Sequence, residues 1–226
     1  MDLIDILTKV SVKIDCKSES HDEHGTGTII CDDGDYYVMT AGHCLKKDND
    51  SFFSIDEITI TSVAYDEPVV IPVIEIVKGS DFSEEMDFAL IRIEKPSIDY
   101  NYWDLVKRCD ILLKEESYFC YGFNENNPDG KQYNLLHNGK NQWHLVSDII
   151  TNQPIPAMKI MEGDSGAGVF FKKADVLFCV GYLKMLNHIQ GVGNDVIVYP
   201  TSRFNKMLSE HTKANNFFNL VETWTA

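Results

Sequence analysis

The sequence predicts an all-β protein, folded as a barrel or a sandwich rather than around a parallel sheet. Short runs rich in β-branched and aromatic side chains recur along its 226 residues. Gly, Asp, Asn and Pro separate these runs, so turns limit the length of each strand. The clearest runs lie at residues 28–31, 36–39, 58–60, 69–74, 88–91, 118–121, 168–171, 176–180 and 196–199.

Two segments, one near each end of the chain, have helical periodicity instead. The first spans residues 2–10, and the second runs from residue 201 to about residue 212. Each places its apolar side chains on one face. These side chains are Leu3, Ile6, Leu7 and Val10 in the first segment, and Phe204, Met207 and Leu208 in the second.

Turn chemistry divides the rest of the chain. The sequence DDGD at residues 32–35 lies between two runs and is a strong hairpin signal. Its carboxylates lack the ligand spacing of a calcium loop. The polar residues 124–130 are predicted to form a surface loop. A division near residue 100 gives two β-rich units, which we expect to be an N-terminal barrel at residues 1–100 and a C-terminal barrel with its helix at 101–226.

The charge of the chain bears on its partners and location. There are 35 acidic and 20 basic residues, for a formal net charge of −15, so we expect neither a nucleic-acid partner nor a membrane surface. The acidity serves solubility first, and a protein or peptide is the easier partner. Asp2 and Asp5 lie where an export signal would be positive. Six cysteines without a CxxC pair favour reduced thiols, and we expect a cytoplasmic protein.

Two segments hold a titratable residue beside a predicted strand. In TAGHC, His43 follows the run 36–39, so the strand end can hold the imidazole at a cleft edge. In MDFALI, Asp87 opens an apolar strand, where its burial costs several kcal/mol without a partner. Taken singly, His43 is more simply a structural or surface residue, and Asp87 a residue that ends the strand at the surface.

A third segment surrounds one serine with glycines. In EGDSGAG, Ser165 precedes a predicted strand, and the glycines allow tight turns with positive φ. Such a turn can expose the hydroxyl and direct the N–H groups of Gly163 and Ser165 at one point. Two convergent N–H donors are what a tetrahedral oxyanion needs. The simpler alternative is a glycine-rich hairpin with an incidental serine.

Together the three segments resemble the His, Asp and Ser segments of trypsin-like serine proteases, and the chain resembles a bacterial intracellular member of that family. TAGHC, MDFALI and GDSGAG occur in the family's chain order. GTGTII at residues 25–30 also resembles the family's early glycine-bearing strand. The resemblance implies a chymotrypsin-like double antiparallel β-barrel with a C-terminal helix, and a serine endopeptidase.

The resemblance also implies a role for each residue. Ser165 would attack the scissile carbonyl, His43 would carry the proton, and Asp87 would orient the imidazole. Gly163 and Ser165 would form the oxyanion hole. This chemistry needs no cofactor and no metal.

Substrate preference rests on two lysines. Lys159, six residues before Ser165, corresponds to the base of the family's primary specificity pocket, and Gly181–Met185 corresponds to a pocket wall to which Lys184 could add charge. These ammonium groups would favour cleavage after Glu or Asp. The alternative is that Lys159 turns to solvent and leaves an apolar pocket.

The chain departs from the secreted members of the family at two places. Cys44 occupies one half of their disulfide beside the His, but the partner position falls near Thr26. Asp164 occupies the position that pairs with a freed apolar N-terminus in activated zymogens, and no IVGG-like segment occurs. Asp164 therefore needs another partner. The site is either competent from the start or activated by a regulatory partner protein or an appended domain.

Three alternatives compete with this interpretation. A latent or silent protease-fold module could bind a partner protein and be activated by it, although the chain retains all three residue types. An esterase of another fold would carry a GxSxG elbow, which is missing. His21 and His24 could bind a metal at helical spacing, but they lie in a predicted polar loop.

Overall fold

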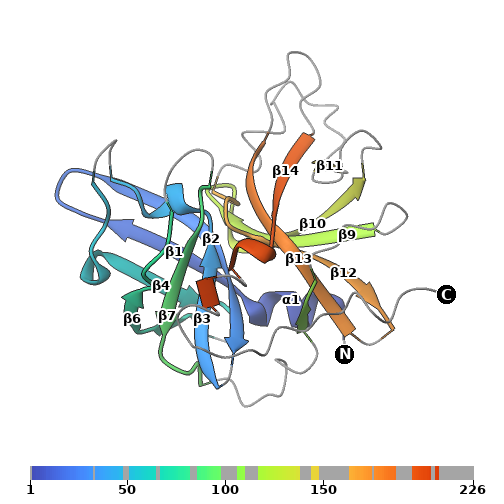
Figure 1. Ribbon diagram of the computed structural model, residues 1–226, viewed down its shortest axis with the longest axis horizontal. Coiled ribbons are helices and arrows are strands. Elements are labelled where there is room, and N and C mark those ends of the chain that lie inside the picture. Colours follow the sequence, from blue (N-terminus) through green and yellow to red (C-terminus); the bar gives the residue numbers. More distant parts are fainter. Residues whose placement is uncertain are drawn as a thin grey trace.

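The computed structural model of the chain is shown in Figure 1. It describes residues 2–32, 34–47, 51–64, 67–81, 86–97, 106–109, 117–137, 144–147, 163–174, 176–186, 195–204 and 207–208. The first elements are α1 (Leu3–Val10), β1 (Ser11–Lys17), β2 (Asp22–Asp32), β3 (Asp35–Thr40), the 3-10 helices η1 (Gly42–Leu45) and η2 (Ile55–Glu57), β4 (Ile58–Ser62), β5 (Val69–Ile71), β6 (Val73–Ile76) and β7 (Ala89–Ile93). The second group is β8 (Val106–Arg108), β9 (Ser117–Asn124), β10 (Asn127–His137), β11 (His144–Ser147), β12 (Gly168–Lys173), β13 (Val176–Leu186) and β14 (Asp195–Pro200).

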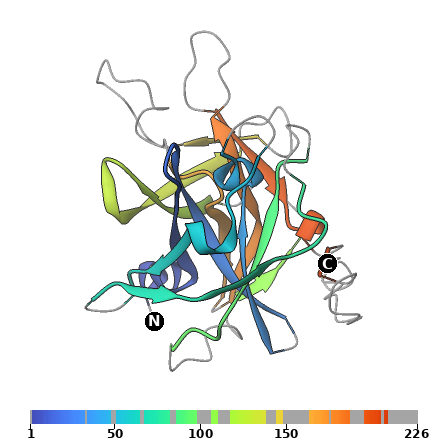
Figure 2. The same ribbon diagram turned by 90° about the vertical axis from the view of Figure 1, so that its left-hand side faces the viewer.

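The strands form two sheets that lie side by side (Figures 1 and 2). In the described residues, the order of the first sheet is β5-β4-β1-β2-β3-β7-β6, and that of the second is β12-β9-β10-β11-β14-β13-β8. An additional pairing of β12 with β13 closes the second sheet on itself. All described pairings are antiparallel except that of β13 with β8. The predicted all-β architecture is therefore confirmed.

Three apolar clusters fill this architecture. One lies within each sheet, and the third lies in the seam between the sheets. The seam cluster, which we call the shared core, joins α1 to both sheets through Leu7, Met39 and Tyr182. It also includes Phe204 from the C-terminal segment. The two sheets are therefore held together by burial of apolar surface, which disfavours their separation.

The central strands of the first sheet are buried on both faces. In β3, Tyr37 and Met39 face the shared core, whereas Val38 faces the core of the first sheet. In β7, Leu90 faces the shared core and Ile91 faces the core of the first sheet. A strand with two buried faces needs a continuous apolar sequence rather than an alternating one. This is why the runs at 36–39 and 88–91 carried no polar alternation.

Several local predictions can be compared with the structure. The helix predicted at 2–10 is α1, and the hairpin predicted at 32–35 joins β2 to β3 with Gly34 at φ 87°. The C-terminal segment is helical at 202–204 and 207–208, and the rest of the predicted helix lies outside the described residues. The division into two domains near residue 100 stays a prediction.

The predicted surface loop at 124–130 is wrong in part. Strand β9 ends at Asn124, and β10 already begins at Asn127. The side-chain oxygen of Asn124 accepts hydrogen bonds from the backbone N–H groups of Asn126 and Asn127, at 3.0 and 2.9 Å. This Asx-type turn replaces a longer loop and leaves Asn124 buried.

Within the described ranges, no helix combines the length and the apolar character that crossing a membrane requires.

Candidate active site

His43 lies in η1, directly after β3, and faces Asp87. Its Nδ1 lies 2.9 Å from Oδ2 and 3.1 Å from Oδ1 of Asp87. The backbone N–H of His43 also donates to Oδ1, at 2.8 Å. The imidazole is 44% exposed, whereas the carboxylate is only 4% exposed. Because the buried carboxylate accepts at Nδ1, the network assigns the proton to that nitrogen and leaves Nε2 free as a base.

The backbone at Asp87 is held in an unusual conformation. Its φ is 40°, in the left-handed region that residues other than glycine rarely adopt. The hydroxyl of Tyr182 donates to the Asp87 carbonyl at 2.9 Å, and Arg203 donates to the carbonyl of Met86. Such strain costs on the order of 1–3 kcal/mol and persists only where the surroundings enforce it. Tyr182 and Arg203 were missed in the sequence, because nothing in the local sequence indicates a contact with the remote backbone at residues 86 and 87.

The surroundings of His43 change its basicity. Burial of the imidazole lowers its pKa, but the neighbouring Cys44 sulfur and the Asp87 carboxylate outweigh this effect. The pKa of His43 therefore lies above its ordinary value. A carboxylate in contact with an imidazole favours the protonated ring.

The turn that carries Ser165 packs against the segment that carries His43. The carbonyl of Ser165 accepts a hydrogen bond from the N–H of Thr26 at 2.9 Å, and the Cys44 sulfur lies 3.5 Å from the same oxygen. Gly166, at φ 88°, lies so close to Thr40 that a Cβ there would be 2.2 Å from its hydroxyl oxygen. Only glycine fits this contact, which brings the predicted Ser and His segments together.

The polar groups of the Ser165 turn have few partners inside the protein. The Ser165 hydroxyl donates to the carbonyl of Lys184 at 3.3 Å, and forms no hydrogen bond to His43 in the structure. Within the described ranges, the N–H groups of Gly163 and Ser165 form no hydrogen bond with another residue. The described part of the chain therefore supplies no acceptor to either group.

His24 packs against the start of this turn. Its ring lies so close to Gly163, at φ 99°, that a Cβ there would be 2.7 Å from the imidazole. The prediction that His24 lies in a solvated loop is wrong, because strand β2 begins at Asp22 and leaves the ring half-buried. The described residues contain no cluster of three or more potential metal ligands.

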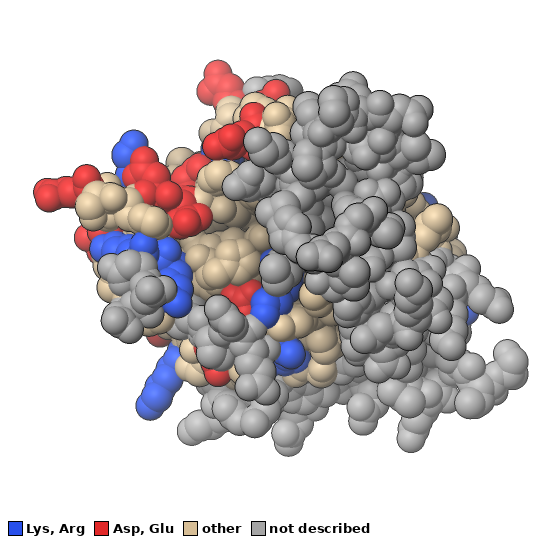
Figure 3. Space-filling model, turned by 90° about the horizontal axis from the view of Figure 1, so that it is seen from above, with Lys and Arg blue, Asp and Glu red and all other residues tan. Residues whose placement is uncertain are grey.

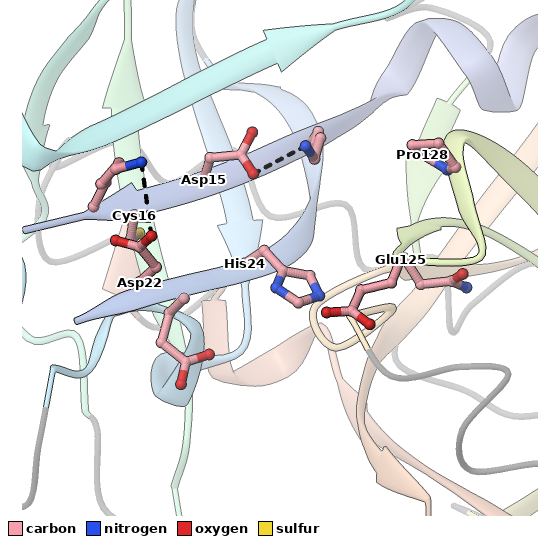
Figure 4. Close-up of a pocket in the computed structure, with 10 residues that line it drawn as sticks. Asp15, Cys16, Asp22, His24, Glu125 and Pro128 are labelled. Atoms are coloured by element: carbon pink, nitrogen blue, oxygen red, sulfur yellow. Dashed lines mark ion pairs between the residues drawn. The ribbon is translucent and has the colours of Figure 1, made fainter.

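A hollow of about 360 Å³ opens beside the turn (Figure 4). His24 and Asn124 line it, together with Cys16 and Pro128. The charged residues on its wall are Lys13, Asp15, Lys17, Asp22, Glu23 and Glu125. Lys13 pairs with Asp15 at 3.0 Å and Lys17 with Asp22 at 3.7 Å, so the surplus charge is negative. Acidic side chains also gather over the described part of the surface seen from above (Figure 3).

Asp164 is buried directly before Ser165. Its side chain is 1% exposed and accepts hydrogen bonds from the Asn124 amide, 3.1 Å from each carboxylate oxygen, and from Tyr133. Burial raises its pKa, the two hydrogen bonds and the charge of Lys131 lower it, and the balance raises the pKa to about 7. The partners of Asp164, which the sequence did not identify, are thus the neutral amide of Asn124 and the phenol of Tyr133.

The predicted substrate-binding residues have different surroundings. Lys159 lies outside the described residues. The Lys184 ammonium donates to the Tyr199 hydroxyl at 2.7 Å and lies 4.8 Å from the centre of that ring. Gly181 is buried against the backbone of Tyr199. Their roles in substrate binding stay predictions.

All six cysteines are free thiols. The residue that faces Cys44 is Gly25, one position before the expected Thr26. A Cβ at Gly25 would lie 2.5 Å from the Cys44 sulfur. Strand β2 and η1 therefore approach more closely here than a second side chain would allow.

Comparisons with known proteins identify the family and the fold. A family model described as trypsin matches residues 8–207. Three similar solved structures are a thermostable serine protease from an extremophilic microorganism, an inactivated protease paralogue of the scabies mite, and the Rv3671c protease of M. tuberculosis in its active form. Their TM-scores are 0.63, 0.63 and 0.61 at 15%, 15% and 14% identity. The matches cover 93%, 93% and 91% of this chain, and 100%, 98% and 82% of the other chains. No curated protein matches the sequence.

Replacing Asp164 by Asn tests its burial with little change in shape. The pKa of the folded carboxyl is raised from 3.8 to about 7, so between about pH 4 and pH 7 the folded state keeps a proton that the unfolded state has lost. The free energy of unfolding contributed by Asp164 therefore falls as the pH rises through this window and is constant above it. We expect the stability of D164N relative to wild type to rise over the same window. Urea denaturation at a series of pH values measures it, and a difference that does not vary with pH would contradict the raised pKa.

Proposed function

Because the chain belongs to the trypsin family and is a trypsin-like serine protease with the chymotrypsin-like fold, we propose that it hydrolyses peptide bonds of a protein substrate with Ser165, His43 and Asp87. The observation that carries this proposal is the contact between three remote segments. Asp87 holds Nδ1 of His43, and the Ser165 backbone lies against the turn that contains His43.

The first half of the reaction forms an acyl-enzyme. The Ser165 hydroxyl gives up its hydrogen bond to the Lys184 carbonyl, passes its proton to Nε2 of His43, and forms a bond from Oγ to the scissile carbon. The carbonyl oxygen becomes an oxyanion. The carbon–nitrogen bond then breaks, and His43 returns the proton to the leaving amine.

The second half restores the enzyme. A water molecule loses a proton to His43 and attacks the acyl carbon, and the ester bond to Oγ breaks as His43 protonates Ser165. Asp87 keeps its negative charge throughout and stabilises the imidazolium formed in each half. Its low exposure supports this role, because a charge away from water acts more strongly on its neighbour.

The oxyanion is bound, in this proposal, by the N–H groups of Gly163 and Ser165. Their lack of partners among the described residues supports this assignment. The positive φ of Gly163 orients the peptide planes of the turn. Loss of one oxyanion donor typically lowers kcat by about 10²–10³-fold.

We propose a preference for Glu or Asp before the cleaved bond. The support is the charge of Lys184, whose carbonyl accepts a hydrogen bond from the Ser165 hydroxyl at 3.3 Å. Lys159 adds a second cation by its position in the sequence.

We also propose a reducing compartment, the cytoplasm, as the location of the protein. Its six free cysteines support this, and at Cys44 a glycine replaces the partner that a disulfide needs. Alkylation of thiols immediately after cell lysis, followed by mass spectrometry, should modify all six cysteines under denaturing conditions. A disulfide-linked peptide would contradict the proposal.

Labelling with a fluorophosphonate probe tests the nucleophile. We expect the purified wild-type protein to be labelled at Ser165 and S165A to be unlabelled, because an activated serine alone attacks phosphorus readily. H43A should lose labelling as well, since no base then takes the proton. Absence of labelling in the wild-type protein would favour the alternative of a latent module that a partner activates.

Peptides that differ only at the residue before the cut test the specificity. We expect Glu to give a kcat/KM about tenfold or more above Leu, and Arg to be the poorest, because one ion pair with a buried group supplies about that factor. K159A and K184M should each reduce the advantage of Glu. A preference for Arg or Leu in the wild-type protein would contradict the acidic specificity.

A further inference from the structure

Asp164 poses a physical problem that the proposed reaction does not explain. A carboxylate that is 1% exposed loses several kcal/mol of hydration unless its oxygens find donors. Among the described residues, no Lys, Arg or His forms an ion pair with it. Its neighbours are Asn124, with 3% exposure, and Tyr133, with 1%. This buried group of three residues, which we call the Asp164 clamp, lies next to the Ser165 turn.

The orientation of the Asn124 amide is set by the turn after it. Its Oδ1 accepts from the backbone N–H groups of Asn126 and Asn127, and from the side-chain amide of Asn127 at 3.1 Å. The oxygen must therefore face the turn, and the nitrogen must face the other way. There Nδ2 lies 2.7 Å from the Tyr133 hydroxyl and 3.1 Å from each oxygen of Asp164. Of the two flipped orientations of the Asn124 amide, these hydrogen bonds allow only one.

The clamp acts on the turn through the backbone of Asp164. The N–H of Ala167 donates to the Asp164 carbonyl at 3.0 Å, and the peptide bonds on either side carry the N–H groups of Asp164 and Ser165. Gly122 in β9 leaves space for the carboxyl, since a Cβ there would be 2.3 Å from Oδ1. A side chain held at both oxygens cannot rotate, so the plane of the next peptide bond is restricted as well.

We propose that Asn124 is a positioning residue, which through Asp164 holds the N–H group of Ser165 in the direction that binds the oxyanion. The inference rests on the proposed function. Asn124 touches neither substrate nor the reacting atoms. Its amide donates the hydrogen bonds that a cation would otherwise supply to a buried carboxylate. In this proposal a neutral side chain of the second sheet therefore orders the site.

N124A tests this role through the separation of kcat from KM. We expect kcat and the rate of fluorophosphonate labelling to fall by about 10–100-fold, with KM changed by less than about threefold, because the lost interaction orients a transition-state donor. N126A, which removes an exposed amide from the same turn, is the matched control and should behave as wild type. Y133F, which removes only the phenol hydroxyl, should give a smaller loss in the same parameter.

N124D supplies a readout that a merely structural residue would not change. Its new carboxyl would face Asp164 at hydrogen-bond distance, so the two groups share a proton at low pH and repel each other when both ionise. Expressed as a fraction of wild-type activity at the same pH, we expect the activity of N124D to be well above that of N124A near pH 5 and to fall steeply toward pH 8, because His43 titrates in the wild type as well. The other titratable groups around Asp164 are Tyr133, Lys131 and His24, the last of which packs against Gly163. They are the same in wild type, N124A and N124D, which are the proteins compared in this pH profile.

The outcomes separate this inference from the proposed function. A wild-type protein that neither cleaves peptides nor reacts with the probe refutes the proposed function and the inference with it. An active wild type with N124A at full kcat refutes the positioning role alone. Thermal unfolding of each variant identifies a loss of folding. If N124A unfolds, the activities of Y133F and N124D test the inference instead. A pH profile of N124D activity that parallels the wild-type profile would overturn the inference.

Discussion

The candidate site depends on the hydrogen bonds that join the Ser165 turn to the first sheet. The N–H of Thr26 donates to the Ser165 carbonyl, and the Thr28 hydroxyl accepts from the N–H of Gly168 at 2.8 Å. The Thr26 hydroxyl in turn donates to the Gly163 carbonyl at 3.2 Å. Thr26 and Thr28 are fully buried, and a buried polar group left unpaired would cost about 1–3 kcal/mol. The register between the two sheets is therefore fixed where His43 and Ser165 must meet.

A seam held in this way can maintain conformations that are unfavourable by themselves. Asp87 has a positive φ, and its carboxylate is buried beside His43. Asp164 is buried without an ion pair among the described residues. The second sheet stabilises both of them, Asp87 through Tyr182 of β13 and Asp164 through Asn124 of β9. The packing of the shared core offsets the free-energy cost of these unfavourable features.

Much of the fold could be predicted because its strands follow simple rules of burial. The runs at 36–39 and 88–91 are apolar throughout because β3 and β7 lie between two cores. His43, Asp87 and Ser165 were predicted as site residues because each combines a titratable or nucleophilic group with an uncommon local sequence. Asn124, in contrast, was assigned to a surface loop, since a cluster of Asn and Asp usually marks an exposed turn.

The remaining features depend on contacts between residues that are remote in the sequence. Tyr182 and Asp87 are 95 positions apart, and Asn124 and Asp164 are 40 apart. A buried Tyr in an apolar strand gives no indication that its hydroxyl holds the backbone of an acid in another sheet. The contact between Gly25 and Cys44 likewise depends on how closely two segments approach. The sequence placed the residue opposite Cys44 near Thr26, one position from the residue that the structure shows.

A crystal structure of the protein after reaction with a fluorophosphonate tests the central claim most directly. The account predicts a phosphorus–oxygen bond to Ser165, a phosphoryl oxygen within hydrogen-bond distance of the N–H groups of Gly163 and Ser165, and Nδ1 of His43 still bound to Asp87. An adduct on another residue would contradict it. So would a phosphoryl oxygen directed away from the turn.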